Sequence, residues 1–295
     1  MGVGYLPKKR RSNGNVILKC KMFGQAQALR LVMRAFGAVE RARDVSHGLK
    51  DKFCHGLAVA QDEGHIPSAY FQPFFVGCMA MMAASAFFFL SMSSFDNKWK
   101  TSILVSGLIT FIAAVHYWYM RDYWASNATS PTFFRYVDWI LTVPLMCVEF
   151  YLILKAAGAT KKLMWRMIGL SVIMLVTGYL GEAVYTSGAQ PAIWGLVSGL
   201  AYFAIVYDIY MGEAKKLAVA AGGAVEDAHN TLVKFVVIGW AIYPIGYMAG
   251  TAGWYGEAGQ IFGMNLSLDV IYNIGDAINK IGFGLVVYNL AVQSK

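Results

Sequence analysis

Seven long apolar runs constrain the fold of this chain more than any other feature of its sequence. A helix of about 20 apolar residues crosses the hydrocarbon of a bilayer, and several runs reach or exceed that length without a charge. Lipid offers no hydrogen-bond partners to the backbone, so helices are favoured over open sheets. Only 14% of the residues are charged, whereas soluble domains average about 25%. The sequence therefore predicts an all-α integral membrane protein.

The runs predict a bundle of seven transmembrane helices within a domain of residues 66–295. The predicted spans are 69–94, 101–119, 133–154, 163–185, 191–211, 232–252 and 261–292. The connections between them are short, except for the polar segment 212–233, which contains Gly222 and Gly223. The four cysteines have no CxxC or other metal-ligand spacing, so no metal site is predicted.

Residues 1–65 differ in charge from the rest of the chain. They hold 12 Lys and Arg against 5 Asp and Glu, whereas residues 66–295 hold 13 against 12. A basic, acid-poor segment is typical of an organelle transit peptide. The alternatives are a disordered basic tail and an unused upstream start codon. Because the predicted membrane domain is nearly neutral, the basic pI gives no support to nucleic-acid binding.

The short connections predict the orientation in the membrane. Lysines gather in alternate connections, at positions 98 and 100, 155, 161 and 162, and 215 and 216. The opposite connections hold Arg121, Asp122 and Glu257, and Glu182 lies near the end of the fourth span. Since positive loops stay in the cytoplasm, we expect the N-terminus of the helical domain outside and Lys295 inside.

The last apolar run carries three charges: Asp269, Asp276 and Lys280. A charged side chain in a membrane costs several kcal/mol, so such residues usually face the protein interior and have a function. Asp276 and Lys280 are four residues apart and therefore share one helix face. A buried lysine amine can form a Schiff base with a carbonyl compound. No role is predicted for Asp269.

The third run also carries ionisable residues: Arg135, Asp138 and Glu149. Asp138 and Glu149 are eleven residues apart, which places both carboxyls on one face and about 16 Å apart along the axis. This separation excludes direct contact and suits two stations on one proton path. The alternative is a polar cluster that only holds helices together.

Three segments resemble the microbial (type 1) rhodopsins, and the proteorhodopsin group in particular. They are RYVDWILTVPLMCVEF at 135–150, GWAIYPIGY at 239–247 and DAINKIGFG at 276–284, within a resemblance that covers residues 70–293. The resemblance implies a seven-helix bundle with buried all-trans retinal, held covalently by Lys280 as a protonated Schiff base. It also implies a retinal pocket formed by Trp139, Thr142, Met146, Trp240, Tyr243 and Pro244.

The resemblance assigns roles to the charged residues. Asp138 and Asp276 are counter-charges to the Schiff base, which needs one in a low-dielectric core. Arg135 keeps both carboxylates ionised, and Asp138 accepts the Schiff-base proton after illumination. Glu149 would be protonated because its apolar surroundings disfavour the charged form, and it would return a proton from the cytoplasmic side. The set Asp138, Thr142 and Glu149 is typical of outward proton pumps.

Four further positions have finer interpretations. His116 matches a histidine that hydrogen-bonds the acceptor, although it could also join two helices. Met146 occupies a colour-tuning site and implies absorption of green light. Gly195 could open a window for a carotenoid antenna or allow close helix packing. Glu182 could join the proton exit or be a solvated carboxylate at a helix end.

The predicted function is therefore a light-driven outward proton pump rather than an enzyme. Its predicted partners are the lipid bilayer and protons, and the resemblance implies homo-oligomers such as pentamers or hexamers. Two alternatives stay open. One is a sensory rhodopsin that signals through a partner, and the other is a seven-helix receptor or scaffold without retinal.

Overall fold

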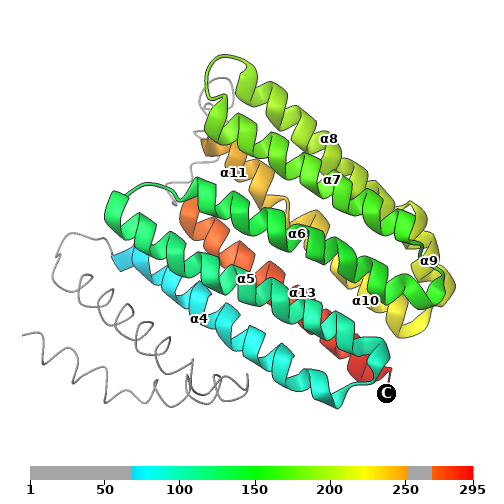
Figure 1. Ribbon diagram of the computed structural model, residues 1–295. Helices are drawn as coiled ribbons and strands as arrows, with labels where there is room; N and C mark the ends of the chain where they lie inside the picture. Colours follow the sequence, from blue (N-terminus) through cyan, green and yellow to red (C-terminus); the bar gives the residue numbers. More distant parts are fainter. Residues whose placement is uncertain (1–67, 251–267, 295) are drawn as a thin grey trace, which may run out of the picture. The chain divides into compact units, whose positions relative to one another are not determined.

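The computed structural model describes residues 68–250 and 268–294 (Figure 1). The predicted extension 1–65 and Glu257 lie outside these residues. Within the described ranges the chain forms helices and no strand. The α-helices are α4 (Ser68–Ser91), α5 (Asn97–Asn127), α6 (Thr132–Leu154), α7 (Lys161–Tyr179), α8 (Gln190–Tyr210), α9 (Glu213–Ala221), α10 (Gly223–Lys234), α11 (Ile242–Gly250) and α13 (Leu268–Gln293). The 3-10 turns are η1 (Met92–Ser94) and η2 (Lys155–Ala157), and the π-helical segments are η3 (Leu180–Val184) and η4 (Phe235–Gly239).

Seven helical segments in the described part of the chain are long and apolar enough to cross a membrane. They are Pro73–Ser94, Asn97–Asn127, Thr132–Ala157, Lys161–Val184, Gln190–Ala221, Gly223–Met248 and Asp269–Gln293. The predicted fold, an all-α membrane protein with seven spans, is thereby confirmed. The fifth span joins α8 to α9, and the sixth joins α10, η4 and α11.

The helices close into a bundle (Figure 1). Each helix from α4 to α7 contacts the helix that follows it in the chain, so that the series ends with the contact of α7 with α8. The last helix, α13, contacts α4, α5, α10 and α11, and α8 contacts α10 and α11. The helix α6 contacts α5, α7 and α10. The helices α6 and α13, which carry the charged residues of the predicted site, can therefore present side chains to one shared interior.

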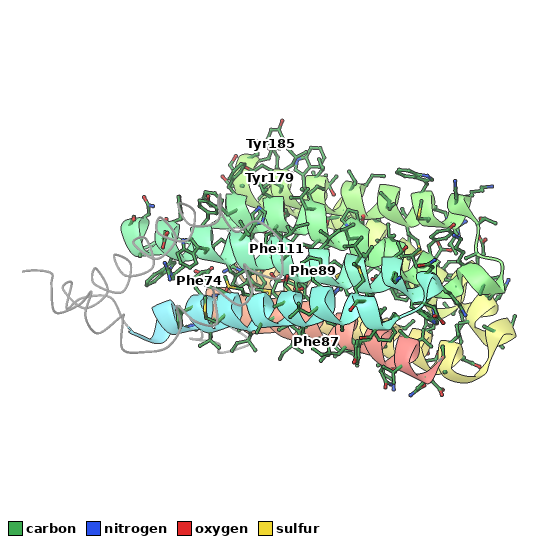
Figure 2. All side chains as sticks on the ribbon, turned by 60° about the horizontal axis from the view of Figure 1, so that its bottom comes forward. Phe74, Phe87, Phe89, Phe111, Tyr179 and Tyr185 are labelled. Carbon is green, nitrogen blue, oxygen red and sulfur yellow. The ribbon has the colours of Figure 1, made fainter. Side chains whose placement is uncertain are left out.

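Polar and apolar side chains are distributed as expected for lipid surroundings. The buried residues of α6 include Arg135, Asp138 and Glu149, which form one stripe, whereas Leu141 beside this stripe is exposed. Figure 2 shows aromatic side chains along the helices, and among them Phe87 and Phe111 are exposed. The exposed apolar surface suits contact with lipid, and the charged residues of α6 are kept in the interior.

The polar segment 212–233 is helical, which corrects the predicted connection. Helices α9 and α10 fill it, and only Gly222 separates them, with φ +63°. Small and apolar side chains on both helices pack inward, including Ala214, Ala218 and Leu232, which are fully buried. Hydropathy misses these helices because their outer faces are charged, although alanine, glutamate, lysine and leucine are strong helix formers. The sixth span therefore begins at Gly223 and not at residue 232.

Helix α5 is also longer than predicted. It runs from Asn97 to Asn127, so Arg121 and Asp122 lie in the helix rather than in a connection. Arg121 is buried, and its Nη2 donates to Asp122 Oδ1 at 2.7 Å. The predicted span ended before the first charged residues. The helix continues past them, and Arg121 is paired with Asp122 within it.

Candidate functional site

The amine of Lys280 lies between two buried carboxylates inside the bundle. Lys280 is 3% exposed, and its Nζ donates to Asp276 Oδ2 at 2.8 Å. Nζ also donates to Oδ2 of Asp138, which comes from α6. The i, i+4 spacing of α13 supplies one carboxylate, and the packing of α6 against the interior supplies the other. A buried cation is tolerated only with partners of this kind.

Asp276 is held by several donors besides Lys280. Tyr243 Oη donates to its Oδ1 at 2.6 Å, and Tyr117 Oη donates to its Oδ2 at 3.1 Å. Trp139 Nε1 donates to Oδ1 at 3.2 Å. Both oxygens of Asp276 are thus already satisfied, which stabilises the ionised form and fixes its position. The arrangement fits a permanent counter-charge.

Asp138 has a different environment. It is fully buried, and its Oδ1 has no hydrogen-bond partner among the described residues. Thr142 on the next turn donates to the backbone carbonyl of Asp138 at 2.9 Å and not to its carboxylate. Asp138 therefore combines a contact to Lys280 Nζ with an oxygen that can still take a proton.

His116 approaches the acceptor without bonding to it. Its Nδ1 lies 4.0 Å from Asp138 Oδ1, whereas the same nitrogen contacts the carbonyl of Ile112 at 2.9 Å. A carbonyl only accepts, so Nδ1 carries the hydrogen. The predicted hydrogen bond to Asp138 is not formed in this structure, although the imidazole is close enough to act on it electrostatically.

Arg135 contacts Asp269 rather than the two counter-charges. Its Nη2 donates to Asp269 Oδ1 at 2.8 Å and to Asn273 Oδ1 at 2.9 Å. Ser130 Oγ donates to the same carboxylate oxygen at 2.8 Å. Asp269, for which no role was predicted, is thus the ion-pair partner of Arg135. Its spacing of seven residues from Asp276 places both on one face of α13 and could have indicated this.

Glu149 is the second buried carboxyl of α6. It is 0% exposed, and Ser106 Oγ from α5 donates to its Oε1 at 3.1 Å. Its Oε2 has no partner in the described part of the chain. An unpaired buried carboxylate is very costly, so this environment favours the neutral acid. Ser106 was not predicted, although Ser102, Ser106 and Thr110 recur every four residues on one face of α5.

Four of the predicted pocket residues, Trp139, Met146, Trp240 and Tyr243, belong to one apolar cluster in the bundle. Trp139 and Trp240 are buried, and the rings of Trp139 and Tyr243 are 4.9 Å apart between centroids. Met146 and Thr142 are buried on α6. Pro244 differs, because it is exposed on α11.

Two residues with open interpretations have clear neighbours. A Cβ on Gly195 would lie 2.7 Å from Cε1 of Tyr247, a buried residue whose hydroxyl donates to the carbonyl of Pro191 at 2.5 Å. This contact supports the helix-packing interpretation of Gly195. Glu182 is half-buried in η3 and accepts a hydrogen bond from Tyr136 Oη at 2.7 Å, so it is not simply a solvated carboxylate.

The comparison with known families agrees with this geometry. The family of bacteriorhodopsin-like proteins matches residues 72–294 of the chain. The chain belongs to this family. It is 43% identical over 221 residues to the green-light absorbing proteorhodopsin of Gamma-proteobacterium EBAC31A08, covering 75% of the chain and 85% of the relative. It is 44% identical over 223 residues, with the same coverage, to the blue-light absorbing proteorhodopsin of Gamma-proteobacterium Hot 75m4.

Solved structures of other members have the same fold. The blue light-absorbing proteorhodopsin from Med12 matches with a TM-score of 0.62 and 37% identity. The match covers 77% of this chain and 100% of that one. Xanthorhodopsin, described as a light-driven ion pump with dual chromophore, matches with a TM-score of 0.65 and 27% identity. The match covers 77% of this chain and 94% of xanthorhodopsin. The family comprises light-driven ion pumps, so the prediction of a protein other than an enzyme is confirmed.

Membership of the bacteriorhodopsin-like family implies a retinal chromophore, and the residues of this site fit one. A primary amine is buried beside two carboxylates, which is the requirement of a charged nitrogen in an apolar interior. Aromatic rings of Trp139, Trp240 and Tyr243 supply the apolar lining of such a pocket. No group of three or more potential metal ligands occurs within 68–250 and 268–294.

Proposed function

We propose that this chain is a light-driven outward proton pump in which Asp138 accepts the proton of Lys280 Nζ and Glu149 replaces it. The contrast between the two carboxylates at Lys280 is the observation that supports this most. Asp276 has both oxygens satisfied by donors, whereas Asp138 Oδ1 has no hydrogen-bond partner among residues 68–250 and 268–294. Of the two, Asp138 is therefore the base that has room for a proton.

The chemistry that bound retinal supplies is the absorption of visible light and the isomerisation of a double bond. The chain provides the rest. Asp138 Oδ2 already contacts Nζ, so the first transfer needs little movement of heavy atoms. Asp276 remains charged throughout, because three side chains other than Lys280 donate to it. These donors fix the position of the Asp276 carboxylate, so that a negative charge stays beside Lys280 Nζ when a proton returns to it.

Glu149 supports transport in one direction. It lies eleven residues after Asp138, or about 16 Å further along α6, and it is fully buried. A neutral acid at this depth can release its proton toward Lys280 from the side opposite to Asp138. Acceptor and donor on opposite sides of one nitrogen make the net movement of protons vectorial.

The charges at the helix ends support the proposed orientation. Lys155, Lys161 and Lys162 follow the Glu149 end of α6, which the positive-inside rule places in the cytoplasm. Arg135, Asp269 and Ser130 occupy the opposite end, on the exit side of Asp138. Protons would then enter past Glu149 and leave past Asp138.

The proposed function needs no carotenoid antenna, and Tyr247 lies directly against Gly195, where such a molecule would bind. Association into pentamers or hexamers stays a prediction.

Illumination of cells that contain the protein and retinal tests the proposed function. We expect the medium to become more acidic in the light and the change to disappear with a protonophore, because outward pumping builds a proton gradient that the protonophore dissipates. A pH electrode in an unbuffered suspension measures it. The absence of acidification together with a slow photocycle would contradict the pump and favour the sensory rhodopsin.

Replacing Glu149 by glutamine tests the donor. We expect the return of the proton to Lys280 Nζ to become about 100-fold slower, since an amide cannot supply it. The preceding loss of that proton should be unchanged, because Asp138 is intact. Flash photolysis at the visible band separates the two steps. Glu213→Gln on α9 is the matched control, because Glu213 is 42% exposed by side chain and bonds Arg166 at the surface. An unaltered recovery in Glu149→Gln would refute its role as donor.

A further inference from the structure

One buried imidazole has no place in the proposed function so far. His229 lies on α10 and is 0% exposed. Its Nε2 contacts the carbonyl oxygen of Ile209 at 2.8 Å, whereas Nδ1 has no hydrogen-bond partner within the described ranges. A carbonyl only accepts, so Nε2 carries the hydrogen and Nδ1 presents a free lone pair. His229 thus offers a buried, vacant proton-binding atom.

The imidazole lies next to the donor end of α6. Its ring is 5.5 Å from the ring of Phe150 at an interplanar angle of 76°, and Phe150 directly follows Glu149 in the chain. Oε2 of Glu149 has no hydrogen-bond partner in the described part of the chain. Nδ1 of His229 and Oε2 of Glu149 are therefore two atoms, on residues that adjoin Phe150, at which a proton can be exchanged.

The other side of His229 leads toward the surface. Glu226 lies one helical turn before His229 on α10 and shares its face, and Asn230 is the next residue in the chain. Lys215 of α9 joins them, with its Nζ 3.3 Å from Glu226 Oε1 and 2.8 Å from Asn230 Oδ1. The side chains of Lys215 and Glu226 are 29% and 31% exposed. Polar groups thus continue from the buried imidazole to solvent.

The remaining elements around His229 offer few competing charges. On α8, Asp208 precedes Ile209, whose carbonyl accepts from His229, but Arg166 binds both carboxylate oxygens of Asp208 at 2.7 and 2.8 Å. On α13 no Asp, Glu, Lys or Arg follows Lys280 before Gln293. On α6, Glu149 is the nearest carboxyl in sequence to Phe150. Lys215, Glu226 and Glu149 are therefore the ionisable groups that matter for a proton on His229.

We propose that His229 is a proton-relay residue that passes protons from the cytoplasmic surface to Glu149. This inference rests on the proposed donor function of Glu149. A proton from solvent binds Nδ1 and forms an imidazolium, while the Ile209 carbonyl keeps its bond to Nε2. After Glu149 has released its proton, the imidazolium gives a proton to the carboxylate, and both groups become neutral.

The test is the rate of proton uptake in His229→Gln, measured in lipid nanodiscs with retinal bound. Glutamine can still donate to the Ile209 carbonyl, but it cannot carry a proton. We expect uptake from the medium, reported by a pH-sensitive dye after a flash, to become at least about tenfold slower. The first return of the proton to Lys280 Nζ should stay as fast as in the unmodified protein, because Glu149 begins the cycle protonated.

The pH profile distinguishes a relay from a structural bond. In the unmodified protein the uptake rate should fall as rising pH empties Nδ1, because only the imidazolium can give its proton to Glu149. In His229→Gln this fall should vanish. His229→Phe keeps a ring beside Phe150 and is measured in parallel, so that either variant suffices if the other does not form the pigment.

Tyr202→Phe is the matched control. Tyr202 Oη donates to the carbonyl of Val236 at 3.0 Å, so this variant also loses a buried bond from α8 to the sixth span but no ionisable group. Normal uptake in Tyr202→Phe with slow uptake in both His229 variants supports the relay. Unchanged uptake in the His229 variants, or equal slowing in Tyr202→Phe, would overturn it. A failure of the donor is seen separately, in the unaltered recovery of Glu149→Gln.

Discussion

Lys280→Ala is expected to lack any visible absorption band after the addition of all-trans retinal. Alanine has no amine to bond the aldehyde carbon, so the colour of a covalently held, charged chromophore cannot develop. The loss should be complete rather than partial. The measurement is the visible spectrum of the purified protein before and after the addition of retinal, at equal protein concentration.

Lys234→Ala is the control for this prediction. Lys234 is an exposed lysine at the end of α10 and should be dispensable for the band. Lys280→Ala also leaves Asp138 and Asp276 without their shared cation, which for a buried pair costs about 3–5 kcal/mol. The double variant Lys280→Ala/Asp138→Asn removes one of these charges, and helical circular dichroism tests whether each variant folds. An unchanged band in either variant without Lys280 would contradict the attachment site.

The sequence predicts the fold because hydropathy and charge suffice for it. Apolar runs of about 20 residues fix the number of spans. The same criterion fails at α9 and α10, where charged outer faces hide buried residues such as Ala218 and Leu232. His229 was overlooked for that reason, because it belongs to a segment that was predicted to be a connection.

The predicted site depends on two kinds of contact. The pair Asp276 and Lys280 follows from helical spacing alone and is present in the structure. The contact of Lys280 with Asp138 joins residues 142 positions apart, and only the family resemblance indicated it. The bonds of Tyr117 to Asp276 and of Arg135 to Asp269 depend on the packing of α5, α6 and α13, which no local pattern specifies.

The difference between Asp138 and Asp276 leads to the second large prediction. Asp138→Asn is expected to reduce light-driven proton transport at least about 100-fold, because an amide cannot accept the proton of Lys280 Nζ. The variant should still bind retinal, since Asp276 remains as a counter-charge held by Tyr117, Tyr243 and Trp139. The initial pH change of illuminated vesicles gives the rate, and the visible band gives the amount of pigment.

Asp276→Asn and Asp122→Asn make the prediction specific. Asp122 has a side chain that is 48% exposed, so its variant should pump normally. Asp276→Asn should lower the yield of pigment, because Tyr243 and Trp139 lose the anion that they bind, yet the pigment that forms should still lose its Nζ proton to Asp138. Asp276 cannot replace Asp138 as acceptor while donors occupy both of its oxygens. Proton release that survives in Asp138→Asn but not in Asp276→Asn would show that the two carboxylates have the opposite roles.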